Sequence, residues 1–148
     1  MTSGDDVEGS SLALGVDLVL VADVAHSIEQ FGARYTRRLF TDSEIGYCMS
    51  APHLVAERFA VRFAAKEATT KLLRVESDAL IWRDIEVERD ARGWCDIVLH
   101  GDVRDMARRQ GLSDFAHSMS HERAYAMATV VARRTRFPNS GRGTHTAT

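Results

Sequence analysis

The sequence predicts one α+β domain, and three features lead to that prediction. A short run rich in valine and leucine near the start has the length of a buried strand. A periodic segment in the middle has the length of a long helix, and segments of alternating polarity later in the chain have the form of hairpins. Because no βαβ unit repeats, we expect one long helix packed on a small antiparallel sheet.

Composition limits the class of protein before any motif is considered. The 148 residues are enough for a single domain with a core, and 45% apolar and 27% charged residues are ordinary for a soluble protein. A net charge of −2 gives no basic surface for nucleic acid. The first residues are polar, and no apolar run approaches the length of about 18 residues that a transmembrane helix needs. We therefore expect a cytoplasmic protein without a membrane segment. Cys48 and Cys95 are expected to be reduced thiols.

The folded part is expected to span residues 12–134. The segments before and after it, residues 1–11 and 135–148, are polar and rich in small residues, which is typical of disorder. The sequence therefore predicts one domain between two disordered ends.

The first elements follow from the apolar pattern and from helix-capping residues. Residues 12–22 form the predicted buried strand, with Asp17 in its middle. A helix is expected from Val24, with Asp23 as its N-cap and Gly32 as its end.

A capping box and a long periodic helix come next. Thr41 and Glu44 have the spacing of a capping box, so a short helix is expected to begin there and to end near Pro52. The long helix is expected over residues 53–73. Five positions at spacings of i, i+3, i+4, i+7 and i+11 predict its buried stripe, namely Val61, Ala64, Ala65, Ala68 and Leu72.

The second half of the chain predicts two hairpins separated by a short helix. Residues 84–101 alternate in polarity around a turn and form the first hairpin. A short helix follows, with Asp102 as its N-cap and Gly111 at its end. Residues 115–121 and 124–132 form the last two strands.

The only two lysines of the chain, Lys66 and Lys71, both lie on the long helix, whereas 17 other positions carry arginine. One interpretation is an i, i+4 ion pair between Glu67 and Lys71, which stabilises a helix by roughly 0.2–0.5 kcal/mol. The other is that a compact ammonium is needed to meet a phosphate in a confined site. The sequence leaves both interpretations open.

Asp17 is a carboxylate within an apolar strand. A buried lone charge is unfavourable unless it is paired or bound to a metal. Asp17 therefore either lies at a wet strand end, or pairs with an arginine, or shares a hard cation with Glu67. Two carboxylates completed by phosphate oxygens and water are a usual way to hold Mg²⁺.

Four segments, in order, resemble the 4′-phosphopantetheinyl transferases, and most closely the small holo-acyl-carrier-protein synthases. They are Gly-Val-Asp-Leu-Val at 15–19, Arg-Phe-Ala-Ala-Lys-Glu-Ala-Thr-Thr-Lys at 62–71, Asp-Ile-Glu-Val at 84–87 and Ser-Met-Ser-His-Glu at 118–122. The resemblance implies an enzyme that moves the phosphopantetheine arm of coenzyme A to a serine of an acyl carrier protein. It implies Mg²⁺, release of adenosine 3′,5′-bisphosphate, and a homotrimer with active sites between subunits.

The resemblance also implies roles for single residues. Asp17 and Glu67 match the metal ligands, and with Lys71 they form the implied catalytic set. Arg62 and Lys71 match residues that meet the coenzyme A phosphates. Lys66 is expected either to hold Glu67 or to reach a phosphate.

Three further residues are expected to contact coenzyme A: Arg74, Ser120 and His121. His121 is either the general base for the serine proton or a residue that lines the site, and a water held by a metal ligand is the alternative base.

The sequence departs from the family pattern at two places. Where relatives commonly have a glycine-rich loop after the second lysine, this chain has Arg74, whose side chain is expected to substitute for backbone contacts. Where many relatives have an arginine facing an acidic carrier protein, this chain has Asp23, and Arg34, Arg37 and Arg38 are expected to supply the positive surface. These departures keep a second hypothesis open, a non-catalytic relative that binds coenzyme A or a carrier protein.

Overall fold

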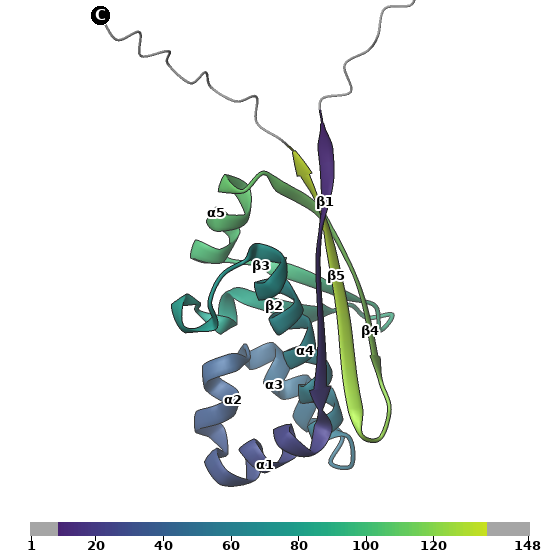
Figure 1. The fold of residues 1–148 in the computed structure, drawn as a ribbon. Helices are drawn as coiled ribbons and strands as arrows, with labels where there is room; N and C mark the ends of the chain where they lie inside the picture. Colours follow the sequence, from purple (N-terminus) through teal and green to yellow (C-terminus); the bar gives the residue numbers. More distant parts are fainter. Residues whose placement is uncertain (1–8, 136–148) are drawn as a thin grey trace, which may run out of the picture.

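A long helix, α4 (Val55–Leu73), packs along a three-stranded antiparallel sheet. The structure, a computed structural model, describes residues 9–135. The strand order is β1 (Ser10–Leu20), β5 (Tyr125–Thr135), β4 (Leu112–His121), so the first strand pairs with the last. Figure 1 shows the sheet on one side of the molecule and the helices on the other. This arrangement confirms the predicted α+β class and the long helix on a small antiparallel sheet.

The five residues of the predicted stripe on α4 are all buried, because one side of the helix lies against β1 and β5. The helix is buried well beyond that stripe, since other elements cover its remaining faces. Its buried polar side chains are Arg62, Lys66, Thr69 and Thr70.

Two helices precede the capping box, and only one of them was predicted. α1 (Val21–Phe31) ends at Gly32, whose positive φ of 51° favours glycine, and α2 (Ala33–Leu39) begins directly after it. The predicted cap of α1 is wrong, because Leu20 is the N-cap and Asp23 lies in the first turn.

The capping box is confirmed, and its glutamate has a second function in the core. In α3 (Asp42–Met49) the Thr41 side chain accepts a hydrogen bond from the backbone N–H of Glu44, and the Glu44 carboxylate accepts one from the backbone N–H of Thr41. This carboxylate is 2% exposed. It also accepts a hydrogen bond of 2.9 Å from the backbone N–H of Val87 and pairs with the Lys66 ammonium at 2.9 Å. A buried ion pair thus ties α3 to α4 and to the first hairpin.

That hairpin consists of β2 (Ile85–Arg89) and β3 (Cys95–Leu99), as predicted. Helix α5 (Gly101–Arg109) follows it and ends before Gly111. The N-cap of α5 is His100, so the prediction that Asp102 caps it is wrong.

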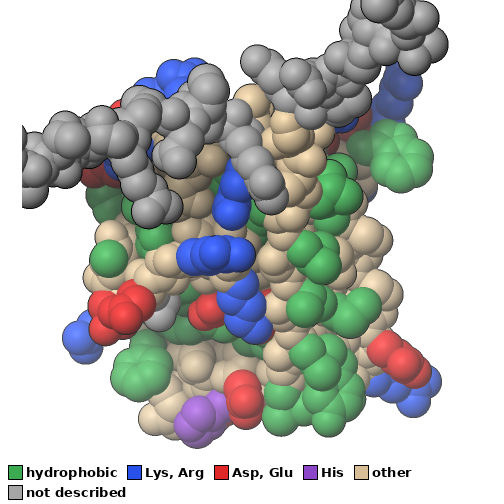
Figure 2. Space-filling model, turned by 45° about the horizontal axis from the view of Figure 1, so that its top comes forward, with side chains coloured by type: hydrophobic (Ala, Val, Ile, Leu, Met, Phe, Trp, Pro, Cys, Tyr) green, Lys and Arg blue, Asp and Glu red, His purple; other side chains and the backbone are tan. Residues whose placement is uncertain are grey.

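Strand β1 is buried on one face only, which corrects the prediction of a fully buried strand. Its inner face carries mostly small residues, whereas its outer face carries large apolar side chains. Figure 2 shows hydrophobic side chains gathered in a column along one side of the molecule. The large apolar residues exposed on the outer face of the sheet are Leu12, Leu14, Val16, Leu18 and Leu20 from β1, and Tyr125 and Met127 from β5.

The ends of the fold lie slightly outside the predicted limits of 12 and 134. Ser10 and Ser11 belong to β1, and Thr135 belongs to β5. Gly9 is exposed and has no regular structure, and the rest of the two segments predicted to be disordered lies outside the described residues.

Both cysteines are free, as predicted. Burial raises the pKa of the Cys48 thiol to about 12, so this thiol stays protonated. Among the described residues, no helix is both long and apolar enough to cross a membrane.

Replacing Gly15 with alanine is expected to destabilise the protein by about 3 kcal/mol or more, because overpacking a tight contact forces the backbone to shift. A Cβ atom at Gly15 would lie 1.8 Å from the carbonyl oxygen of Ala68, where β1 touches α4. Urea unfolding measures the loss. Gly46→Ala is the matched control, because no atom lies within 4 Å of its added Cβ, and its stability should be unchanged or slightly higher. Equal effects of both substitutions would contradict this close packing.

Candidate active site

Carboxylates from three elements line one hollow beside β1. Asp17 lies on the inner face of β1, Glu67 on α4 and Asp23 on α1, and all three line a hollow of about 440 Å³, here called the carboxylate hollow. Burial raises the pKa of Glu67, the negative charge of Asp17 raises it further, and Lys71 lowers it. The structure therefore brings together Asp17 and Glu67, fifty residues apart in the sequence.

Lys71 pairs with Asp17 rather than forming the intrahelical pair with Glu67. Its ammonium donates hydrogen bonds to Asp17 Oδ1 at 2.9 Å and to the carbonyl oxygen of Val16 at 3.0 Å. The partner of Asp17 is thus a lysine, where the sequence left an arginine open. The Asp17 side chain is 15% exposed and that of Lys71 53%, so the pair lies at the mouth of the hollow.

The carboxylate hollow has the donor chemistry that Mg²⁺ requires. Mg²⁺ prefers oxygen ligands and usually takes one or two carboxylates from the protein, completed by phosphate and water. Asp17 and Glu67 supply two carboxylates on different elements, and their mutual repulsion raises the pKa of Glu67. A cation between them would relieve that repulsion, so these residues fit a magnesium ion.

A second group of possible metal ligands lies elsewhere, on the first hairpin. Carboxylate oxygens of Glu86 and Glu88 and a ring nitrogen of His100 lie within 4.8 Å of one another. Thr41 donates a hydrogen bond to Glu86 at 2.5 Å, and His100 lies 3.0 Å from the other oxygen of that carboxylate. None of these residues lines the carboxylate hollow.

Three arginines surround the ring of Tyr47. The guanidinium carbons of Arg58, Arg62 and Arg89 lie 4.2, 4.4 and 4.8 Å from the ring centre. They line a hollow of about 300 Å³, here called the arginine hollow, which His121 also lines. Such a concentration of planar cations suits an anion with several oxygens, above all a phosphate.

Arg62 is the most buried of these arginines, at 3% exposed. Its Nε has no hydrogen-bond partner within the described part of the chain. A buried donor without an acceptor is unfavourable, so the stability of the fold must offset this one. The contact between Arg62 and coenzyme A stays a prediction.

His121 and Ser120 face opposite sides of β4. His121 lines the arginine hollow, and its Nδ1 lies 3.3 Å from a carboxylate oxygen of Glu57. Side chains alternate along a strand, so Ser120 lies exposed on the outer face with the apolar side chains of β1 and β5. Within one chain, neither residue lines the carboxylate hollow.

Lys66 does not lie in either hollow, although it is the neighbour of Glu67 in the sequence. Its side chain is 0% exposed, and its ammonium bonds the Glu44 carboxylate and the carbonyl oxygens of Trp82 and Ile85. Burial lowers the pKa of Lys66, and the Glu44 carboxylate opposes that shift. The expectation that Lys66 holds Glu67 or reaches a phosphate is therefore corrected. Lys66 forms a buried ion pair in the core with Glu44.

Arg74 occupies a backbone position that favours glycine. It is the C-cap of α4, in the left-handed region with φ 56° and ψ 42°. Its N–H donates to the carbonyl oxygens of Lys71 and Thr70. The chain thus keeps the backbone turn that a glycine would make, and adds a side chain to it.

Arg74→Gly is expected to stabilise the protein by about 0.5–1 kcal/mol. A left-handed conformation costs an L-residue about 1–2 kcal/mol, and glycine avoids this cost, but glycine also loses more backbone entropy on folding, which offsets part of the gain. Arg74→Ala keeps the strain and is the control. Thermal unfolding should order the proteins with Arg74→Gly as the most stable. Equal stability of the glycine and alanine variants would show that the turn is not strained.

The carboxylate hollow and the arginine hollow lie on different sides of α4. Arg62 and Glu67 are five residues apart, which places them about 140° apart around a helix. The residues that line the two hollows do not overlap, and His121 and Met119 of β4 line the arginine hollow but not the carboxylate hollow. The two hollows, here called half-sites, therefore lie on different sides of α4.

Of the residues that line the arginine hollow, the sequence pointed only to Arg62 and His121. The other cations of this hollow come from α4 and β2, and Tyr47 comes from α3. The one local signal is the i, i+4 spacing of Arg58 and Arg62, which places both on the same side of α4.

Comparison with known proteins identifies the family. Residues 13–130 match the family model of the 4′-phosphopantetheinyl transferase superfamily, ACPS. This match covers most of the chain and includes both half-sites. The chain belongs to the 4′-phosphopantetheinyl transferase superfamily.

Within that superfamily the chain is similar to holo-[acyl-carrier-protein] synthases. It is 40% identical to the synthase of Koribacter versatilis over 121 residues, which cover 81% of this chain and 96% of that protein. It is 39% identical to that of Gloeobacter violaceus, over 79% of this chain and 89% of that protein. The structure of the Chronobacterium ammoniagenes ACPS–CoA complex matches with a TM-score of 0.77 at 28% identity, covering 85% of this chain and 99% of that one.

Proposed function

We propose that this protein transfers the 4′-phosphopantetheine arm of coenzyme A to a serine hydroxyl of an acyl carrier protein, in a Mg²⁺-dependent reaction in the cytoplasm. The observation that carries the proposal is the meeting of Asp17 and Glu67 at one hollow, with Lys71 paired to Asp17. The similarity to holo-[acyl-carrier-protein] synthases and to a coenzyme A complex supports it.

The reaction is a displacement at phosphorus. The serine oxygen forms a bond to the phosphorus that carries the pantetheine arm, the pyrophosphate P–O bond breaks, and adenosine 3′,5′-bisphosphate leaves. Asp17 and Glu67 would hold Mg²⁺, which when bound would neutralise charge on the phosphate oxygens. Lys71 places a second positive charge next to those oxygens.

The serine proton needs an acceptor in the carboxylate hollow. His121 lines the arginine hollow of its own chain and contacts Glu57. We assign His121 to ligand binding because it lines the same hollow as the three arginines. We assign the acceptance of the proton to a water hydrogen-bonded to Asp17 or Glu67.

The arginine hollow binds the nucleotide end of coenzyme A. A phosphate there meets Arg58, Arg62 and Arg89. Arg74, exposed beyond the end of α4, and Ser120 are proposed to contact the same ligand.

Because the two half-sites of one chain lie on different sides of α4, we propose that the complete site forms between two chains. The apolar side chains exposed on the outer face of β1 and β5 are a surface that a neighbouring copy can cover. We propose a homotrimer in which the carboxylate hollow of each protomer meets the arginine hollow of the next.

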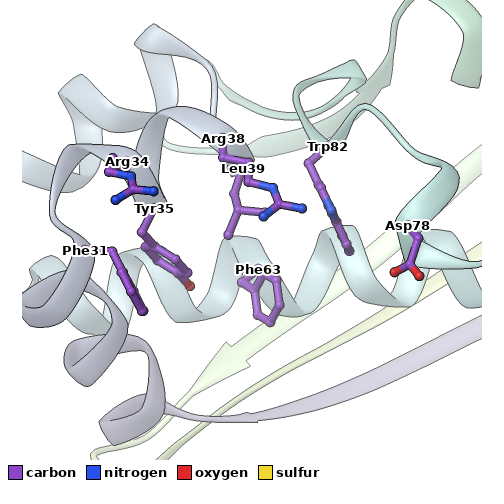
Figure 3. Close-up of a pocket in the computed structure, with 8 residues that line it drawn as sticks. All are labelled: Phe31, Arg34, Tyr35, Arg38, Leu39, Phe63, Asp78 and Trp82. Atoms are coloured by element: carbon purple, nitrogen blue, oxygen red, sulfur yellow. The ribbon is translucent and has the colours of Figure 1, made fainter.

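A groove beside the carboxylate hollow is the proposed docking surface for the carrier protein. It measures about 500 Å³, and Asp78 of the short 3₁₀ helix η1 (Ser77–Ala79) and Trp82 of η2 (Trp82–Asp84) line it. Figure 3 shows Phe63 rising from α4 between Tyr35 and Trp82, with Arg34 and Arg38 above it. This combination of apolar floor and cationic rim suits an acidic helix, and Tyr35 and Phe63 also line the carboxylate hollow.

Intact mass spectrometry tests the proposal. An apo acyl carrier protein incubated with this protein, coenzyme A and Mg²⁺ should gain the mass of one phosphopantetheine arm, and EDTA should prevent the gain. A folded protein that binds coenzyme A but modifies none of several carriers would favour the second hypothesis, a non-catalytic relative.

A further inference from the structure

We infer that Lys71 competes with the divalent cation for Asp17, so that the ammonium moves from this carboxylate toward the coenzyme A phosphates when the cation binds. The inference rests on the proposed function and adds a second role for Lys71. In that role Lys71 couples the binding of the cation to the binding of coenzyme A.

The contact that carries the inference is a two-point attachment of the ammonium to β1. Lys71 Nζ lies 2.9 Å from Asp17 Oδ1 and 3.0 Å from the Val16 carbonyl oxygen. An ammonium in this position uses the carboxylate that a magnesium ion would need. Both oxygens belong to β1, whereas Lys71 comes from the last turn of α4, so the ion pair is not imposed by one local segment.

The ammonium and a metal ion cannot share this carboxylate without repulsion. Mg²⁺ binds oxygen at about 2.1 Å, which would place a doubly charged ion within a few ångströms of the ammonium. The Lys71 side chain is 53% exposed, so it has room to turn outward, whereas the Asp17 side chain, at 15% exposed, is fixed on its strand. Lys71 is therefore the partner that moves.

The charges around the hollow favour such an exchange. Within the described chain, the charged residues that line it are Asp17, Asp23 and Glu67, all of them carboxylates. Lys71 at its mouth is the cation that faces them. Once its ammonium turns toward a phosphate, three negative charges remain to attract the metal, so phosphate and metal each promote the binding of the other.

This role requires lysine rather than arginine. A single ammonium on a flexible four-carbon stem can exchange one oxygen partner for another. A planar guanidinium would hold the Asp17 carboxylate through two hydrogen bonds and release it less readily. This difference explains why position 71 is a lysine although most basic residues of the chain are arginines.

Binding of Mn²⁺ without coenzyme A, followed by the EPR signal of the free ion, tests the inference. Lys71→Met removes the ammonium and keeps most of the side-chain length. It is expected to bind Mn²⁺ about three- to tenfold more tightly than the unmodified protein, because an exposed ion pair no longer has to break. Arg83→Ala is the matched control. It also removes one positive charge, but from an exposed pair with Asp42 at 3.2 Å outside the hollow, and should leave Mn²⁺ affinity unchanged.

NMR of lysine labelled with ¹⁵N provides a second readout, since the chain has only two lysines. Addition of Mg²⁺ should shift the ammonium signal of Lys71 and leave that of buried Lys66 in place. In Asp17→Asn, whose side chain no longer forms the ion pair, the shift should be lost.

Each other outcome overturns the inference in a recognisable way. Equal or weaker Mn²⁺ binding by Lys71→Met, with normal binding by the unmodified protein, refutes the competition and leaves the metal site intact. Absence of Mn²⁺ binding in all three proteins, both without and with coenzyme A, refutes the metal site itself, and with it the proposed magnesium dependence. An unchanged Lys71 signal at saturating Mg²⁺ refutes the movement.

Discussion

Alanine at Asp17 or at Glu67 is expected to lower the rate of phosphopantetheine transfer on the order of a thousandfold, because loss of one preorganised charge contact at phosphorus has about that effect. The two residues lie in one hollow and share one proposed cation. Removing either leaves a single carboxylate for it. The rate is measured as the mass gain of an apo carrier protein with time.

Two controls separate this effect from a loss of structure. Circular dichroism should show that both variants fold, since Asp17 and Glu67 are only partly buried and their mutual repulsion does not stabilise the fold. Asp42→Ala removes a carboxylate whose side chain is 92% exposed and should transfer at the normal rate. If either hollow variant keeps near-normal turnover, the assignment of Asp17 and Glu67 as metal ligands is wrong.

Lys66→Met is expected to lower the free energy of unfolding by about 3–5 kcal/mol, because it leaves the Glu44 carboxylate buried without its cation. The Lys66 ammonium and the Glu44 carboxylate are 0% and 1% exposed and lie 2.9 Å apart. Urea unfolding monitored by circular dichroism gives the value. The same substitution at Lys71, which is half exposed, should change stability by less than about 1 kcal/mol.

A double substitution shows whether the buried charge is the cause. Adding Glu44→Gln to Lys66→Met removes the unpaired carboxylate, so the double variant should be more stable than the sum of the single losses predicts. Strictly additive losses, or a loss below 1 kcal/mol for Lys66→Met, would contradict the account of this pair.

Local patterns in the sequence were sufficient where neighbouring residues alone decide the structure. The capping box needs only Thr41 and Glu44, and the buried stripe of α4 follows from helical periodicity. The N-caps at Asp23 and Asp102 were wrong because an acidic residue in the first turn is favoured by the helix dipole as well as by capping. α2 was missed because its arginine-rich segment has little apolar periodicity.

The different roles of Lys66 and Lys71 could not be derived from the sequence. Periodicity places them on different faces of α4, but it does not say which face meets β1 and which meets α3 and β2. That choice depends on the packing of residues far apart in the chain, which puts Lys66 against Glu44 and Lys71 against Asp17. The arginine hollow was largely hidden for the same reason.

The outer face of β1 illustrates a limit of a different kind. Its leucines are apolar and so predict a buried strand, but the single chain leaves them exposed. They are half of an interface if the proposed trimer forms.

The central claim of this account is that transfer occurs at a site shared by two protomers. Glu67→Ala damages the carboxylate hollow and Arg62→Met the arginine hollow, so each variant alone should be nearly inactive. Equal amounts of the two, unfolded and refolded together, form mixed trimers in which one site in four, on average, has both hollows intact. We predict that the mixture regains about a quarter of the normal transfer rate, measured by intact mass spectrometry. A mixture as inactive as its components, with mixed trimers confirmed by native mass spectrometry, would contradict the claim and place the whole site within one chain.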